Sequence, residues 1–287
     1  MMRTVLFPGQ GAQFKGMGKD LFPLYPELTR AASEILGYSV EKLCLEDAEN
    51  QLRNTQYTQP ALYVVNAFGY MKKKREGTAD VQADYFAGHS LGEYNALLAA
   101  EVFDFESGLR LVKKRGELMG KASGGAMAAV VGIDAQRIRQ LLDENGLQEI
   151  DLANYNTPTQ TVISGKTDAV NRAEKNFRDL KIRCVVLNVT APFHSRYMQP
   201  AQEEFAAFIK QIRFFPLKTP VISNVTARPH ESGKVPQLLI NQIISPVLWN
   251  DSIRYLLSQR DMQFTEIGSS ILTNMVNEIS KAESVLR

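Results

Sequence analysis

The sequence has few of the residues that bind metal ions or form disulfides. Its 287 residues include two cysteines, Cys44 and Cys184, and three histidines, His89, His194 and His230. Because neither set is clustered at ligand spacing, we expect no bound metal. The two distant cysteines and the absence of a signal-peptide pattern predict a reduced, cytoplasmic protein.

Charge of one sign and long apolar runs are also scarce. Lysine and arginine number 33 against 31 acidic residues, a formal net charge of +2, and 44% of the residues are hydrophobic. The basic block Lys72–Arg75 is too short to predict a nucleic-acid partner. No apolar run approaches the roughly 18 residues of a membrane helix. We expect a globular monomer without a membrane partner, which binds small molecules or proteins.

The first third of the chain alternates strands with helices. Residues 3–7 form a short apolar strand that ends in a glycine-rich turn. Pro60 is placed in the first turn of a helix that ends at its basic residues 72–75. Residues 84–87 predict a second strand, which leads through a tight turn into a helix over residues 93–100.

The middle of the chain has a different order. We expect strands at residues 126–131, 150–153, 161–164 and 184–187, with helices that begin at Asp134 and Asp168. The order β-α-β-β-α-β is that of a ferredoxin-like unit. The helices and strands that follow are expected to belong to the same part of the fold as the first third.

These patterns predict an α/β fold with two parts. An α/β-hydrolase-like large domain is expected to comprise residues 1–123 and 191–287, with a ferredoxin-like small subdomain inserted over residues 124–190. We expect the active site to lie in the cleft between them.

The turn between the second strand and its helix reads Gly88-His89-Ser90-Leu91-Gly92. In a nucleophile elbow, small flanking glycines allow a sharp turn that lifts the serine hydroxyl toward a helix N-terminus. Ser90 is therefore a candidate nucleophile, and the alternative is a serine that only caps the helix.

A serine nucleophile needs a base, and histidine is the usual one. His89 lies on the tight turn next to Ser90 and is expected to point away from it. His230 lies in a polar turn, where we expect a solvated side chain. His194 follows the apolar Phe193 and is the preferred base, although a buried structural histidine is the alternative.

Seven short motifs occur in order along nearly the whole chain. They are Phe7-Pro8-Gly9-Gln10-Gly11-Ala12-Gln13, Thr58-Gln59-Pro60-Ala61-Leu62, Gly88-His89-Ser90-Leu91-Gly92-Glu93-Tyr94, Arg115-Gly116 with Met119, Asn154-x-Asn156-x-Pro158, Phe193-His194-Ser195, and Gln242 with Ser245-Pro246-Val247-x-Trp249. Together they resemble the malonyl-CoA:acyl-carrier-protein transacylase family. The chain is most similar to the free-standing acyltransferases that serve polyketide synthases lacking their own acyltransferase domain.

The resemblance implies a ping-pong transfer through a malonyl-serine on Ser90. His194 would move the proton, and the main-chain carbonyl of Gln242 would orient the imidazole. The N–H groups of Gln10 and Leu91 would form the oxyanion hole. The donor would be malonyl-CoA, the acceptor a phosphopantetheine thiol on an acyl carrier protein, and no bound cofactor is implied.

The resemblance also implies substrate contacts. Arg115 would hold the malonyl carboxylate as a two-pronged fork, which lysine cannot reproduce. Phe193 resembles the malonyl-selective pattern, in which a bulky ring excludes an α-methyl group, and His89 is placed with the substrate-binding residues. Residues 266–270 depart from the family, which usually has a glycine-proline-glycine turn there.

An acidic carrier protein, alone or within polyketide synthase modules, is the partner that the resemblance implies. The basic segments Lys72–Arg75 and Lys113–Lys114 could steer it, or could simply be solvated helix faces. Two alternatives stay open: an acyl hydrolase that clears carrier proteins with the same serine and histidine, and a non-catalytic docking module. Loss of Arg115 would be tolerated in the hydrolase.

Overall fold

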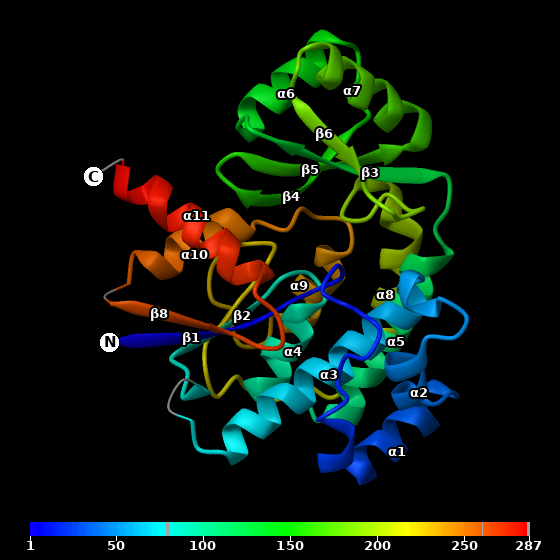
Figure 1. The fold of residues 1–287 in the computed structure, drawn as a ribbon, viewed down its shortest axis with the longest axis vertical. Helices are drawn as coiled ribbons and strands as arrows, with labels where there is room; N and C mark the ends of the chain where they lie inside the picture. The colour runs from blue at the N-terminus through cyan, green and yellow to red at the C-terminus, as the bar shows by residue number, and fades with distance from the viewer. Residues whose placement is uncertain (79–80, 260, 286–287) are drawn as a thin grey trace.

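The computed structural model describes residues 1–78, 81–259 and 261–285. It contains a parallel sheet and a separate antiparallel sheet, so the predicted α/β fold is confirmed. In Figure 1 the antiparallel sheet lies above the parallel sheet, and most helices surround the parallel one.

The parallel sheet has the strand order β7-β2-β1-β8. These strands are β1 (Met2–Phe7), β2 (Tyr85–Gly88), β7 (Val221–Ile222) and β8 (Met262–Glu266). Alternate residues of β1 face opposite sides of the sheet, as the period of a strand requires. Val5 and Phe7 belong to the main apolar cluster, whereas Leu6 belongs to another one on the opposite face.

Helices cover both faces of this sheet. Those on the side of Val5 and Phe7 are α3 (Thr55–Arg75), α4 (Gly92–Ala99) and α5 (Phe105–Lys121), with α1 (Pro26–Leu36), α2 (Val40–Glu46), α8 (Gln199–Ile209) and α9 (Val235–Gln242) packed around them. The opposite face is covered by α10 (Trp249–Leu257) and α11 (Ile271–Val285). Among the described residues, no helix combines the length and apolarity needed to cross a lipid bilayer.

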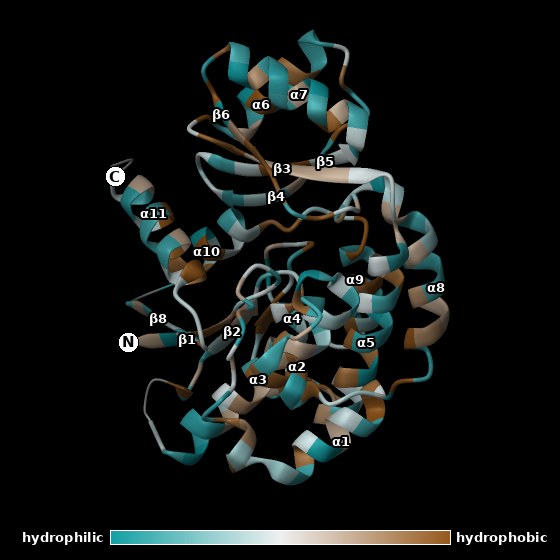
Figure 2. Cartoon of the chain, turned by 45° about the vertical axis from the view of Figure 1, so that its right-hand side comes forward, coloured by the Kyte–Doolittle hydropathy of each residue, from teal (hydrophilic) through white to brown (hydrophobic). Residues whose placement is uncertain are grey.

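The antiparallel sheet has the strand order β4-β5-β3-β6. It comprises β3 (Gly125–Val131), β4 (Asp151–Thr157), β5 (Gln160–Lys166) and β6 (Arg183–Val186), with α6 (Ala135–Glu144) and α7 (Thr167–Asp179) on one face. This is the ferredoxin-like order that the sequence predicts. Figure 2 shows hydrophilic residues on the outer side of α6 and α7. The domain boundaries at residues 123/124 and 190/191 stay a prediction.

Helix α3 differs from its prediction. It begins at Thr55, where the Asn54 side chain accepts a hydrogen bond from the Gln56 N–H, so Pro60 lies inside the helix rather than in its first turn. Proline removes one backbone hydrogen bond there. Burial of Pro60 and its neighbours against α5 offsets that loss, since tertiary packing supplies most of a helix's stability.

Candidate active site

Ser90 lies in a sharp turn between β2 and α4, as the glycine pattern predicts. Its φ of 51° is in the left-handed region, which non-glycine residues rarely adopt. A Cβ atom on Gly88 would lie 2.0 Å from the Gly92 carbonyl carbon, and one on Gly92 would lie 2.0 Å from the Phe7 carbonyl oxygen. Glycine is therefore required at position 88 for β2 to approach the start of α4, and at position 92 for the turn to pack against β1.

Ser90 and His194 are in hydrogen-bond contact although they are 104 residues apart. The distance from Ser90 Oγ to His194 Nε2 is 2.8 Å, and His194 Nδ1 lies 2.9 Å from the Gln242 main-chain oxygen. Nδ1–H therefore donates to this carbonyl, which leaves Nε2 free to accept the serine proton. Burial, reinforced by the positive charge of Arg115, lowers the pKa of His194 to about 3. The imidazole is neutral near pH 7, as a base must be.

The proposed oxyanion residues lie beside this pair. Gln10 and Leu91 line the same pocket as Ser90 and His194. Leu91 immediately precedes α4, and the first N–H groups of a helix have no acceptor within it. Gln10 is held by its side chain, which donates to the Thr55 hydroxyl over 3.2 Å.

Arg115 is buried next to the nucleophile, with 1% of its surface exposed. Its guanidinium donates to Ser90 Oγ over 3.0 Å, to the Gln242 side-chain oxygen over 3.0 Å and to Gln59 over 2.7 Å. All three acceptors are neutral. Within the described part of the chain, Nε of Arg115 is buried without a hydrogen-bond partner, and no carboxylate forms an ion pair with this residue. A buried cation with this environment is suited to an anionic ligand.

The pocket at Ser90 has a volume of about 110 Å³ and is lined by residues of the loops that follow β1 and β2 and by residues of β3 and β4 in the antiparallel sheet. Phe193 is buried and forms part of its wall, as does His89. The His89 ring contacts Trp249, its Nε2 lies 2.9 Å from Asn156 Oδ1, and burial lowers its pKa. The remaining apolar wall is formed by Met119, Met127, Leu187 and Val189.

The prediction of a solvated His230 is wrong. Its side chain is fully buried, and Nε2 lies 2.6 Å from Glu93 Oε1 in the first turn of α4. The polar sequence around His230 indicates a surface turn, but a hydrogen bond from its N–H to the Val221 carbonyl draws the residue against β7. Glu93 was not among the predicted site residues, although it follows the serine motif directly.

Asn224 and Gln59 also contact the site without having been predicted. Asn224 braces the elbow, because its Oδ1 accepts from the Ser90 N–H and its Nδ2 donates to the Gly88 carbonyl, each over 2.7 Å. Asn224 follows β7 at the carboxyl edge of the parallel sheet, where ligand sites of such sheets lie. A polar residue just after a strand is therefore the sequence feature that could have identified it.

The two predicted basic segments lie away from the pocket. Residues 72–75 end α3 and residues 113–114 lie within α5, and none of them lines the pocket at Ser90. Lys113 donates to the Ile35 carbonyl over 2.8 Å, and Lys114 lies 3.9 Å from Glu204. A partner-steering role for these segments stays a prediction.

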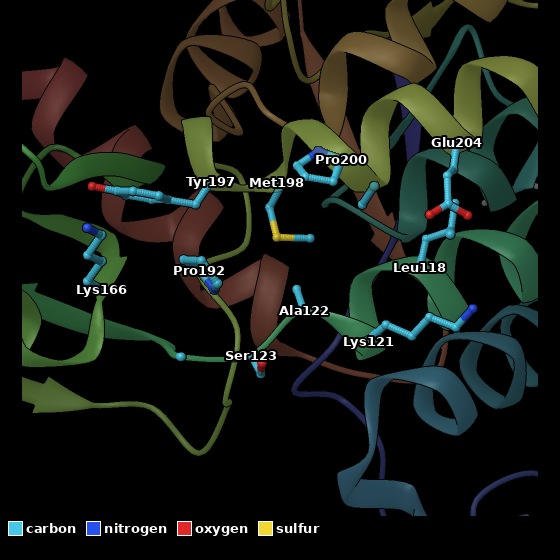
Figure 3. Close-up of a pocket in the computed structure, with 12 residues that line it drawn as sticks. Leu118, Lys121, Ala122, Ser123, Lys166, Pro192, Tyr197, Met198, Pro200 and Glu204 are labelled. Carbon is cyan, nitrogen blue, oxygen red and sulfur yellow. The ribbon is translucent and has the colours of Figure 1, made fainter.

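A second cavity, of about 440 Å³, lies where the chain passes between the two sheets. Figure 3 shows Met198 near its centre, Tyr197 and Lys166 on one side and Lys121 and Glu204 on the other. Ser90, His194 and Arg115 do not line it, whereas all three line the smaller pocket.

Comparison with known proteins agrees with this geometry. The family model described as "Acyl transferase domain" matches residues 4–283. The chain belongs to the acyl transferase family. It is 50% identical over 290 residues to a Bacillus subtilis protein named polyketide biosynthesis malonyl CoA-acyl carrier protein transacylase PksC, with 100% of both chains covered. The resemblance to this family is confirmed.

Solved structures of acyl transferases have the same fold. A malonyl CoA-acyl carrier protein transacylase from Burkholderia pseudomallei matches with a TM-score of 0.95 and 48% identity, covering 98% of both chains. The structure titled as a type II PKS acyl-carrier protein in complex with its malonyl-transacylase matches with a TM-score of 0.91 and 32% identity, covering 98% of this chain and 93% of that one. The prediction of an acyltransferase is thereby confirmed.

Proposed function

We propose that this acyltransferase moves a malonyl group from malonyl-CoA to the phosphopantetheine thiol of an acyl carrier protein. The observation that carries the proposal is the buried Arg115 guanidinium 3.0 Å from the hydroxyl of Ser90. A carboxylate bound there holds a malonyl thioester carbonyl near the nucleophile, whereas an uncharged acyl group leaves the cation unpaired.

In the first half-reaction, Ser90 Oγ forms a bond to the thioester carbonyl carbon and its proton passes to His194 Nε2. The tetrahedral intermediate then collapses, the carbon–sulfur bond breaks, and His194 returns the proton to the departing coenzyme A thiolate. The Gln242 carbonyl stabilises the imidazolium through Nδ1–H, which lies 2.9 Å away. A carboxylate is therefore not required as a third catalytic group beside Ser90 and His194.

The second half-reaction runs the same steps with the carrier thiol as nucleophile. His194 takes the thiol proton, sulfur attacks the malonyl-serine ester, and Ser90 recovers its proton as it leaves. The N–H groups of Gln10 and Leu91 hold the oxyanion in both steps, and each such donor is worth roughly 10²–10³ in rate in other serine enzymes.

The relatives support a polyketide role and an acyl-carrier partner. PksC is named as a polyketide biosynthesis enzyme, and a solved relative is titled as a complex with its acyl-carrier protein. We extend both properties to this chain, with coenzyme A thioester and carrier protein as its two substrates. A cytoplasmic location fits the two free cysteines, Cys44 and Cys184.

Intact-protein mass spectrometry tests the proposal. The enzyme is mixed briefly with malonyl-, methylmalonyl- or acetyl-CoA and then chased with holo carrier protein. We expect a malonyl adduct on Ser90 that moves to the carrier. An adduct that decays equally fast without carrier favours the acyl hydrolase, and no adduct with any donor favours the docking module.

A further inference from the structure

A fully buried carboxylate lies beneath the active site. Both oxygens of Glu93 are hydrogen-bonded: Oε1 lies 2.6 Å from His230 Nε2, while Oε2 accepts from Gln242 Nε2 over 2.7 Å and from the Asn224 N–H over 3.1 Å. Its side chain is 0% exposed, and it lies in the first turn of α4, where the helix dipole favours negative charge. Contacts within the protein therefore take the place of solvent at both of its oxygens.

Three acceptors set how the Gln242 amide is turned: Glu93 Oε2 at 2.7 Å, the Ser90 carbonyl at 3.0 Å and Asn224 Oδ1 at 3.3 Å, of which the Glu93 carboxylate is the nearest. A carboxylate only accepts hydrogen bonds, so it holds the amide NH₂ of Gln242 toward itself. That NH₂ also donates to the Ser90 carbonyl over 3.0 Å, and the amide oxygen then faces Arg115 Nη2 over 3.0 Å. In the opposite orientation the amide NH₂ would meet the guanidinium, donor against donor. The orientation of one amide thus decides whether Arg115 has an acceptor on this side.

His230 satisfies the other oxygen of Glu93. The imidazole Nε2–H donates to Oε1, and the Nδ1 atom is buried without a hydrogen-bond partner among the described residues. A neutral imidazole with its lone pair at Nδ1 meets both conditions. His230 therefore prevents the carboxylate from turning away from Gln242.

Glu93 is also the carboxylate that favours the charged form of Arg115. Burial lowers the pKa of Arg115, and the neighbouring Tyr94 and the charge of Glu93 oppose that effect. The two side chains do not touch, since the Gln242 amide lies between them. This separation leaves the guanidinium available to a ligand carboxylate, whereas a direct ion pair would occupy it.

We propose that Glu93 and His230 are positioning residues, which fix the Gln242 amide and thereby hold Arg115 ready for the acyl carboxylate. The proposal rests on the proposed function of Arg115. The base does not depend on the pair, because His194 is oriented by the Gln242 main chain and not by the amide. At Ser90 the amide contacts the main-chain carbonyl and not the hydroxyl. The pair therefore controls recognition of the malonyl carboxylate more than nucleophile reactivity.

The test compares Glu93→Gln with Glu278→Gln. Glu278 is a matched control, since its carboxylate also accepts side-chain hydrogen bonds, from Thr157 and Thr159, but does not line the pocket. We expect Glu93→Gln to raise KM for malonyl-CoA about tenfold or more with a smaller change in kcat. Acetyl loading and fluorophosphonate labelling of Ser90 should stay within about twofold, and Glu278→Gln should change none of these values.

A second pair of variants covers the case in which Glu93→Gln does not fold. His230→Gln retains an N–H donor for Glu93, whereas His230→Phe does not, so KM for malonyl-CoA should rise in the second and be rescued in the first. Equal losses of malonyl loading, acetyl loading and labelling would overturn the positioning proposal. If the unmodified enzyme forms no malonyl-serine, the proposed function itself fails. That result differs both from a selective rise in KM and from equal losses in the variants.

Discussion

At the scale of single residues, we expect Arg115 to serve substrate recognition and not the chemistry at Ser90. Its guanidinium contacts Ser90 Oγ, Gln242 and Gln59, all neutral acceptors. Arg115→Lys keeps a positive charge but loses the planar fork that matches a carboxylate. We expect kcat/KM for malonyl-CoA to fall about a hundredfold, measured by acyl-enzyme formation, and acetyl loading to fall less than about tenfold. Equal losses for both donors would contradict the carboxylate role.

We expect the pH dependence of acylation to report on His194. Because burial and Arg115 lower its pKa to about 3, the imidazole is already neutral well below pH 6.5, and raising the pH further adds no active base. Acyl-enzyme formation in single-turnover experiments should therefore be level between about pH 5 and pH 8. A rate that halves near pH 6.5 would show that His194 titrates as an exposed histidine does. Removing the positive charge with Arg115→Ala should move the His194 pKa upward.

At the scale of elements, residues 266–270 show how this chain replaces a family turn. Glu266, the last residue of β8, accepts from the N–H of Leu272 and from the N–H and hydroxyl of Thr273, at 3.2, 2.8 and 2.8 Å. Its carboxylate thus caps the N-terminus of α11, where a negative charge is favoured. The sequence identifies the departure from the family, but only the fold brings Glu266 to this helix.

Loss of this cap should lower the free energy of unfolding by a measurable amount. We expect Glu266→Ala to lower the free energy of unfolding by about 1–2 kcal/mol, measured in urea, because the N-terminal N–H groups of α11 lose their acceptor. Glu266→Gln retains an accepting oxygen and should cost less. Malonyl loading should be unchanged in both variants, since Glu266 does not line the pocket. An unchanged unfolding midpoint in Glu266→Ala would show that the cap contributes nothing.

At the scale of the whole molecule, the sequence predicts what is local and misses what is assembled over distance. The strand, glycine turn and helix around Ser90 are encoded within a few residues. His194 is only the preferred base among three histidines, because part of that preference rests on a solvated His230, which the structure shows to be buried. The role of Gln242 can be predicted only from the family resemblance. It orients His194 with a main-chain carbonyl, and every residue type has one. The pair of Glu93 and His230 spans 137 residues, so no local pattern could join them.

We expect the pocket at Ser90 to limit the size of the acyl group. Its volume is about 110 Å³, and the buried ring of Phe193 fills one wall beside His194. Discrimination by a pocket against one methyl group is typically worth about 1–3 kcal/mol, so methylmalonyl-CoA should be a poor donor. Phe193→Ala should raise the ratio of methylmalonyl to malonyl loading about tenfold, measured by competition between the two donors in mass spectrometry. Phe215→Ala, at a ring that is 43% exposed and outside the pocket, is the control and should leave the ratio unchanged. If both donors decline in parallel in Phe193→Ala, the ring supports His194 and does not select the substrate.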